Sequence, residues 1–274
     1  MPELPEVHTI ACGLEKAVAG WSVASAQVLR PECLQGRDEL FLERVPGSKV
    51  VSVGRRGKAL LIHLDPPLVL GIHLKMTGRV YVPQPGDETD KHTNFRLELK
   101  GPGSDKVVFF KDVRRFGYCR VMLPGDVPDW TFLASLGPEP LELEAEKFLE
   151  IFRARRGQIK GLLLNQTVLA GIGNIYADES LFRAGIRPGR PAHRIPEKQL
   201  LLLHASIQEV LSEAIAECGS SISDYRDAQG NAGAFQNRFR VYGRAGKDCL
   251  VCGKTLQQTK VAGRTSVYCP ACQS

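Results

Sequence analysis

Apolar residues near the start of the chain recur at the spacing of a helix. A glycine at position 20 follows apolar side chains that would share one helical face, namely Val7, Ile10, Ala11, Leu14 and Val18. A glycine commonly marks the end of a helix. The pattern predicts an amphipathic helix over residues 5–19.

Beyond residue 20, the apolar residues form short runs that are bounded by glycine or proline. Phe95, Leu97 and Leu99 alternate strictly with polar residues, as one face of a half-buried strand does. Further apolar runs occupy residues 50–53, 59–64, 68–76, 106–110 and 117–123, and a helical stretch near residues 37–45 interrupts the series. Several short strands with regular turns predict a β-sandwich.

A change of periodicity follows Gly137-Pro138-Glu139-Pro140, where we predict a domain boundary. Beyond it, apolar residues follow helical spacing over residues 144–155, 158–166, 174–184 and 196–218. Residues 219–237 are rich in serine, glycine, asparagine and alanine, which indicates a mobile loop. We therefore expect a β-domain over residues 1–136, a helical domain with this loop over 137–237, and a third segment over 238–274.

Composition and charge limit the classes of protein to be considered. The chain has 274 residues, 43% of them apolar and 24% charged, as in soluble globular proteins, and no apolar run is long enough to span a membrane. The N-terminus lacks a secretory signal, so we expect a cytoplasmic protein. The formal net charge is +6, and residues 219–274 carry eight lysines and arginines against three aspartates. This concentrated excess indicates a partner rich in phosphate, although a solvated basic surface would have the same composition.

Four cysteines near the C-terminus have the spacing of a metal site. Cys249 and Cys252 form one Cys-x2-Cys pair, and Cys269 and Cys272 form another after an interval of sixteen residues. Two such pairs supply four thiolates to one tetrahedral zinc ion, which leaves no open position for chemistry. Disulfides are the competing interpretation, and a cytoplasmic location favours zinc. The pattern predicts one structural zinc ion in a small hairpin, of a kind that binds either DNA or protein.

The first three residues contain a candidate nucleophile. If Met1 is removed, the chain begins with the secondary amine of Pro2, and an α-amino group has a much lower pKa than a lysine. Such an amine can attack an electrophilic carbon to form an iminium, with Glu3 beside it as a proton donor. A glutamate at a helix start also complements the helix dipole, so a purely structural role remains open for Glu3.

Two further segments contain residue types that suit nucleic acid. Two glycines precede Asn174 at a predicted helix start, where free backbone N–H groups can bind phosphate, although a plain capped turn would have the same sequence. Arg114 and Phe116 precede one predicted strand and Met76 follows another. These types of side chain can enter a base stack, whereas core packing is the alternative for Met76 and Phe116.

Taken together, these segments resemble the formamidopyrimidine-DNA glycosylase family, which is also called MutM. The resemblance covers essentially the whole chain, and the occurrence of all its motifs in this order is highly specific. Its pieces are Pro2-Glu3-Leu4-Pro5-Glu6-Val7, Lys58, Ile72-His73-Leu74-Lys75-Met76, Arg114-Arg115-Phe116-Gly117, Leu136-Gly137-Pro138-Glu139-Pro140, Gly171-Ile172-Gly173-Asn174-Ile175-Tyr176 and the four cysteines.

The resemblance implies an α+β fold in two parts. An N-terminal β-sandwich with a leading helix would be followed by a helix–two-turns–helix domain that carries a C-terminal zinc-finger β-hairpin. The resemblance further implies Pro2 as the nucleophile, Glu3 as the acid and Glu6 as a supporting residue.

The resemblance also implies the DNA contacts. Lys58 and Arg264 would complete the catalytic set by holding phosphates around the damaged nucleotide. Other contacts to the DNA backbone would come from His92, Lys160, Asn174 and Tyr242. The vacated place in the base stack would be filled by Met76, Arg114 and Phe116, and the segment 219–235 would close over the extruded base.

The implied function is that of a bifunctional DNA glycosylase and AP lyase, which acts as a monomer on damaged double-stranded DNA in the cytoplasm, at the nucleoid. It would remove oxidised purines (8-oxoguanine and formamidopyrimidines) through a Schiff base on Pro2 and then cleave the strand by β,δ-elimination. His8 and Val113 depart from the family pattern, at positions without an assigned catalytic role.

Two alternatives remain open. The related endonuclease VIII branch prefers oxidised pyrimidines and typically begins Pro-Glu-Gly-Pro, whereas Leu4 agrees with the MutM branch. A zinc-ribbon protein that binds DNA without any activity would also account for the C-terminal segment.

Overall fold

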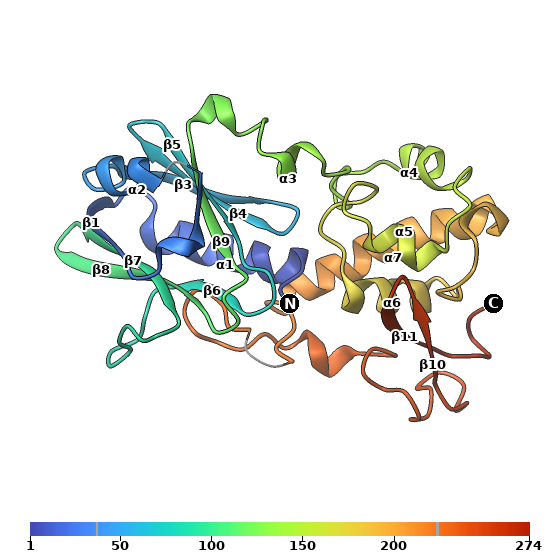
Figure 1. The fold of residues 1–274 in the computed structure, drawn as a ribbon. Helices are drawn as coiled ribbons and strands as arrows, with labels where there is room; N and C mark the ends of the chain where they lie inside the picture. Colours follow the sequence, from blue (N-terminus) through green and yellow to red (C-terminus); the bar gives the residue numbers. More distant parts are fainter. Residues whose placement is uncertain (37, 223–224) are drawn as a thin grey trace. The chain divides into compact units, whose positions relative to one another are not determined.

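The chain folds into two compact units in a computed structural model that describes residues 1–36, 38–222 and 225–274. The first unit contains Met1–Ala134 and Glu217–Ala234, and the second contains Ser135–Ala216 and Phe235–Ser274 (Figure 1). Tyr225 and Ala228, from the predicted loop over 219–237, pack in the core of the first unit. Residues 223 and 224 of that loop, and residue 37 of the helical stretch predicted near 37–45, lie outside the described residues.

The first unit is built on one sheet. Among the described residues, nine strands follow the order β2-β9-β5-β4-β3-β1-β7-β8-β6, and all neighbours are antiparallel except β2 and β9. The strands are β1 (Ser22–Val28), β2 (Leu34–Gly36), β3 (Lys49–Arg56), β4 (Ala59–Asp65), β5 (Leu68–His73), β6 (Gly78–Tyr81), β7 (Thr93–Gly101), β8 (Ser104–Asp112) and β9 (Tyr118–Met122). Two short helices accompany them, α2 (Asp38–Arg44) and α3 (Thr131–Ala134).

Both ends of this sheet contribute to one apolar core. Ile72 of β5 and Cys119 of β9 belong to the same cluster as Phe95 of β7 and Phe110 of β8, whose rings lie 5.3 Å apart. Burial of apolar surface of this kind is the dominant favourable contribution to folding. The predicted N-terminal β-rich fold is therefore confirmed, and its strands are hydrogen-bonded into one continuous sheet whose two ends pack on a shared core.

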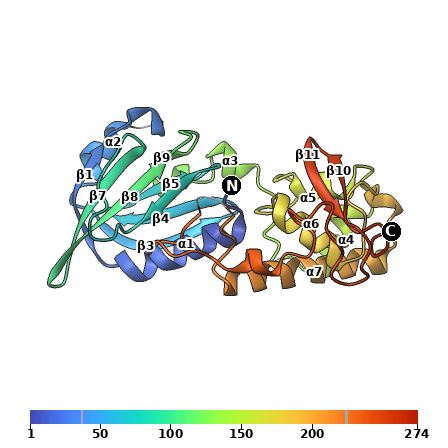
Figure 2. The same ribbon diagram turned by 90° about the horizontal axis from the view of Figure 1, so that it is seen from below.

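The helix α1 (Leu4–Val18) covers part of this core and packs on β3 and β4 (Figure 2). Its predicted apolar face is buried, with Ile10 and Leu14 each 1% exposed. Glu3 is the N-cap residue, and the side chains of Glu3 and Glu6 accept each other's backbone N–H in a capping box. Core packing and hydrogen bonds therefore both fix the start of the helix.

The second unit is helical and ends in a two-stranded hairpin. The four predicted helical stretches are confirmed, and α6 packs against both α7 and β11. Within the described residues, no helix is long and apolar enough to cross a membrane. The elements are α4 (Ala145–Phe152), α5 (Ile159–Leu164), α6 (Asn174–Arg183), α7 (Glu197–Ala216), β10 (Gln257–Val261) and β11 (Arg264–Tyr268).

A tight turn at Ala262 and Gly263 closes the hairpin. Val261 pairs with Arg264, so that only two residues form the turn. Both have positive φ values, 49° and 72°, as a type I′ turn requires. Arg264 therefore stands exposed at the tip of the hairpin.

A buried ion pair anchors the hairpin to the helices of the second unit. Asp178 Oδ1 lies 2.7 Å from Lys160 Nζ, and neither side chain is more than 1% exposed. Asp178 Oδ2 accepts the backbone N–H of Val267 at 3.1 Å, and Lys160 Nζ donates to the carbonyl oxygen of Thr265 at 3.0 Å. Burial raises the pKa of Asp178 to about 6, and the charge of Lys160 opposes this rise. The pair thus joins α5, α6 and β11.

Replacing Lys160 by methionine should destabilise the protein by about 3 to 5 kcal/mol, because the Asp178 carboxylate would stay buried without its counter-ion. Lys147 and Glu150 of α4 form an exposed pair 2.8 Å apart, so Lys147→Met is the matched control and should leave stability nearly unchanged. Urea unfolding followed by circular dichroism measures both variants. Equal unfolding midpoints for Lys160→Met and the wild type would show that the buried pair does not hold the hairpin.

Candidate active site and nucleic-acid contacts

The predicted nucleophile lies at a buried helix start. Pro2 is buried, Glu3 is 2% exposed and Glu6 is 1% exposed, whereas Met1 is half exposed. One carboxylate oxygen of Glu6 accepts the backbone N–H of Glu3 at 2.8 Å, and the other accepts that of Ser220 at 2.7 Å. Hydrogen bonds to a charged acceptor are strong in a buried environment. The residues before α1 are therefore tied to the segment 217–234.

The segment 217–234 adds contacts that no local sequence pattern indicates. A Cβ atom on Gly219, whose φ is 81°, would lie 2.9 Å from Oε1 of Glu6. The Tyr225 hydroxyl donates to the carbonyl oxygen of Cys218 at 3.0 Å, and burial together with the charge of Glu6 raises the pKa of Tyr225. Ser220 and Tyr225 lie 214 and 219 residues from Glu6 in the sequence, so only the fold reveals their role.

Lys58 is a buried residue of the first unit. It follows Gly57 at the turn between β3 and β4 and is 5% exposed. Burial, together with the charges of Lys75 and Lys58, lowers the pKa of His73 to about 3. The neutral imidazole accepts the backbone N–H of Lys75 at 3.0 Å through Nδ1. The two lysines therefore supply the positive charge around His73, which favours an anionic ligand.

Met76, Arg114 and Phe116 form one exposed cluster. Met76 is 40% exposed and Phe116 is 54% exposed, so the core-packing alternative is wrong for both. The Arg114 guanidinium contacts each of them, with Nη1 2.8 Å from the Met76 sulfur and the guanidinium carbon 5.1 Å from the centre of the Phe116 ring. The structure thus brings together three residues from two loops, as their predicted common role in the base stack requires.

Asn174 and Tyr242 border one cavity of about 300 Å³ in the second unit. Thr265 also lines it, and the Asn174 side-chain nitrogen donates to the carbonyl oxygen of Thr265 at 3.1 Å. Arg264 precedes Thr265 and is exposed. Three predicted phosphate contacts are therefore close to one another on α6, on the hairpin and on the loop before it.

Glu179 of α6 fixes the backbone on either side of Val241. Its carboxylate accepts the backbone N–H groups of Arg240, Val241 and Tyr242, at 2.9, 3.0 and 2.8 Å. Burial raises the pKa of Glu179, and these three hydrogen bonds oppose the rise. No local sequence pattern marks Glu179 as functional, because its partners lie more than 60 residues away.

Two other predicted contacts lie further inside the molecule. Lys160 is fully buried, and its ammonium group forms an ion pair with Asp178 and donates a hydrogen bond to the Thr265 carbonyl oxygen. His92 is partly buried, and its carbonyl oxygen accepts the backbone N–H of Asp112 at 2.8 Å. Lys160 therefore acts on the hairpin from within, and His92 lies beside the loop that carries Arg114.

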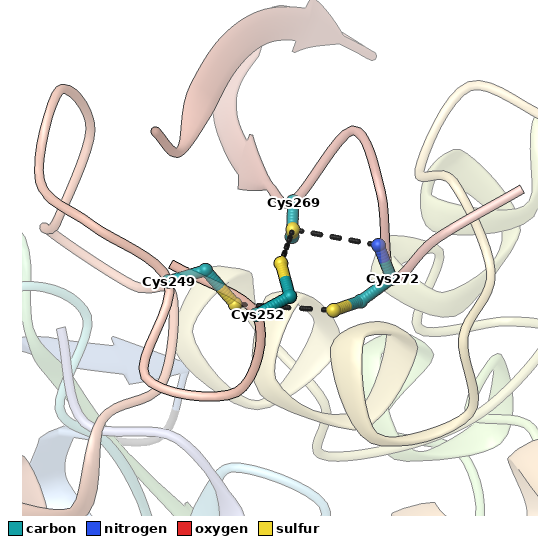
Figure 3. A group of neighbouring side chains, drawn as sticks. All are labelled: Cys249, Cys252, Cys269 and Cys272. Carbon is teal, nitrogen blue, oxygen red and sulfur yellow. Dashed lines mark hydrogen bonds between the residues drawn. The ribbon is translucent and has the colours of Figure 1, made fainter. Parts of the chain in front are cut away.

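The four predicted cysteine ligands converge from two loops (Figure 3). Their sulfur atoms all lie within 4.8 Å of one another, with Cys252 and Cys269 at 3.4 Å and Cys249 and Cys272 at 3.9 Å. A disulfide would need about 2.05 Å, whereas four thiolates around one zinc ion lie about 3.8 Å apart. All four positions belong to the protein, so the cluster is a closed site for one structural zinc ion.

Three family models match the chain, and together they cover most of it. The Formamidopyrimidine-DNA glycosylase N-terminal domain matches residues 1–119, and the Formamidopyrimidine-DNA glycosylase H2TH domain matches residues 136–226. A zinc finger found in FPG and IleRS matches residues 246–274, which include the four cysteines.

Relatives agree with these matches over their full length. A formamidopyrimidine-DNA glycosylase of Nitratidesulfovibrio vulgaris is 40% identical to this chain, and the alignment covers 100% of both. A mutant of Lactococcus lactis FPG, solved in complex with Fapy-dG containing DNA, matches with a TM-score of 0.91 and 34% identity over 100% of both chains. MutM in complex with carbocyclic 8-oxo-G containing DNA matches with a TM-score of 0.90 and 35% identity over the same shares. The chain belongs to the formamidopyrimidine-DNA glycosylase family.

Proposed function

We propose that the chain is a bifunctional DNA glycosylase and AP lyase of base excision repair. It removes oxidised purines, namely 8-oxoguanine and formamidopyrimidines, from duplex DNA and then cleaves the strand at the resulting site. The observation that carries the proposal is the buried helix start, where Glu6 holds Glu3 beside Pro2. Family membership and the complexes of relatives with Fapy-dG and 8-oxo-G DNA support it.

Pro2 acts as the nucleophile once Met1 has been removed. Its secondary amine gives its lone pair to C1′ of the damaged nucleotide, and the bond between C1′ and the base breaks as Glu3 donates a proton. The Pro2 nitrogen then gives its proton to the Glu3 carboxylate. The C1′–O4′ bond opens as O4′ takes up that proton and the nitrogen lone pair forms an iminium with C1′, which acidifies the C2′ protons. Loss of such a proton expels the 3′ phosphate, and a second elimination expels the 5′ phosphate. Hydrolysis of the iminium then returns the free amine.

The damaged nucleotide leaves the base stack before this attack, because C1′ cannot be reached inside a duplex. Lys58, His92, Asn174, Tyr242 and Arg264 hold the phosphates of the deformed strand. Charge-assisted hydrogen bonds from lysine and arginine suit phosphate, and the Arg264 guanidinium can form two at once. The segment 219–235 closes over the extruded base, although residues 223 and 224 of that segment lie outside the described residues.

The cluster of Met76, Arg114 and Phe116 fills the place that the nucleotide vacates. An exposed aromatic ring and a thioether beside a guanidinium can replace lost stacking, and their exposure leaves them free to enter DNA. For Lys160 we propose an indirect part, in which it holds the hairpin backbone at Thr265. We further propose that the protein acts as a monomer, in the cytoplasm and at the nucleoid.

A panel of lesion duplexes should separate this proposal from its two alternatives. The wild type should release 8-oxoguanine and formamidopyrimidines faster than oxidised pyrimidines, whereas an endonuclease VIII-like enzyme would show the reverse order. Glu3→Gln should lower base release by about a hundredfold or more, because the proton donor is lost. Glu43→Gln on the exposed side of α2 is the matched control, with no expected change. Binding of every duplex without release of any base would instead identify a non-catalytic DNA-binding protein.

Loss of zinc should abolish DNA binding because the hairpin that bears Arg264 has few buried residues of its own. Cys252→Ser should therefore bind no zinc and should show no measurable affinity for duplex DNA. Cys12→Ser replaces an exposed cysteine outside the cluster and serves as the control. Metal analysis, circular dichroism and fluorescence anisotropy measure the three properties. Full affinity in a zinc-free Cys252→Ser protein would contradict a structural role for the metal in binding.

A further inference from the structure

We infer that Asp112 is the positioning residue for the cluster of Met76, Arg114 and Phe116. The inference rests on the proposed function, because it assigns a purpose to the residues that are proposed to fill the base stack. Asp112 ends β8, and its side chain is fully buried although the loop after it is exposed. Burial of a carboxylate is unfavourable unless several hydrogen-bond donors contact it. The donors to Asp112 therefore show which parts of the chain it holds in place.

Asp112 joins the two loops through its two oxygens. Oδ1 accepts the Thr77 hydroxyl at 2.5 Å and the backbone N–H of Arg114 at 3.2 Å. Oδ2 accepts the backbone N–H of Gly117 at 2.6 Å. The Arg114 N–H also lies 3.0 Å from the Thr77 hydroxyl oxygen. One carboxylate thus ties the residue after Met76 to both residues that flank Arg115 and Phe116.

The same hydrogen bonds hold an unfavourable backbone conformation. Arg115 has φ 61°, in the left-handed region that is unfavourable for a residue other than glycine. It lies immediately before Phe116, and the Asp112 carboxylate fixes the chain on both sides of this pair. Lys75, immediately before Met76, has φ 51° and donates its N–H to His73. Conformations of this kind persist only where surrounding contacts determine them.

Space around Gly117 and Gly78 limits any alternative arrangement. A Cβ atom on Gly117 would lie 3.0 Å from Oδ2 of Asp112, and one on Gly78 would lie 2.5 Å from the carbonyl oxygen of Leu74. Both loops therefore approach their anchoring atoms as closely as glycine permits. The exposed side chains of Phe116 and Met76 therefore extend from closely packed turns.

Asp112→Asn should slow excision from duplex DNA by about ten- to a hundredfold, because small displacements of a positioned group have effects of this size. The amide has nearly the same volume, but its NH2 group faces an N–H donor on one side of the site. Thr77→Val should act in the same direction, and Thr77→Ser should restore the rate because it keeps the hydroxyl group. Asp105→Asn, at an exposed position of the same strand, is the matched control.

Comparison of two substrates separates positioning from general damage to the fold. A single strand with an abasic site has no opposite base whose stacking must be replaced, so Asp112→Asn should cleave it at the wild-type rate. A 2-aminopurine opposite the lesion in a duplex should report reduced insertion in Asp112→Asn and in Phe116→Ala. An equal loss on both substrates, or unchanged duplex excision in Asp112→Asn while Phe116→Ala is slow, would overturn the inference. Unchanged excision in Phe116→Ala would overturn it together with the assignment of the cluster.

Hydrogen exchange of the free protein tests the same role without any activity. Asp112→Asn should increase exchange in peptides that contain the N–H groups of Arg114 and Gly117, and it should leave peptides of α1 unchanged. Unaltered exchange at both groups would overturn the inference even if the enzyme is active. Absence of activity in the wild type on every substrate would instead overturn the proposed function, and the exchange result would still decide what Asp112 holds.

Discussion

The carboxylate of Glu6 accepts two backbone N–H groups, from Glu3 in the sequence before α1 and from Ser220 in the segment 217–234. This bridge fixes the place where covalent chemistry is proposed to start. Because Glu6 is buried, its hydrogen bonds are poorly screened by water and are strong. An amine that must reach one carbon atom needs a rigid backbone around it, since catalysis by proximity depends on small distances. The apolar face of α1 anchors that backbone in the core.

The same kind of interaction recurs at three of the elements assigned to DNA. A buried acid accepts backbone N–H groups of an exposed loop: Asp112 holds the loop of Phe116, and Glu179 holds the backbone around Tyr242. Asp178 holds the hairpin through Val267 and pairs with Lys160. Buried carboxylates without such donors would be strongly unfavourable, so each of them determines the loop conformation that satisfies it. The exposed side chains then project from backbones that are already in place.

Local patterns in the sequence were sufficient for some of this architecture. The spacing of Ile10 and Leu14 predicts α1, and two Cys-x2-Cys pairs predict the metal site, because both signals lie within short stretches of chain. Strand pairing is not local, and this is why the order of the strands in the sheet could not be predicted from the sequence. The burial of Lys58 and the contact of Glu6 with Ser220 arise between residues far apart in the sequence. The chemistry of the first three residues suggested Pro2 as a nucleophile and Glu3 as a proton donor, the family resemblance implied the same roles, and both assignments are proposals.

The identity of the nucleophile is the central claim, and borohydride reduction with a lesion duplex tests it most directly. Reduction of the iminium fixes the DNA to the amine that attacked C1′, and digestion followed by mass spectrometry locates the modified peptide. We predict an adduct on a chain that begins at Pro2, with Met1 absent and every lysine unmodified. An adduct on Lys58 or another lysine, or an active protein that retains Met1, would contradict it.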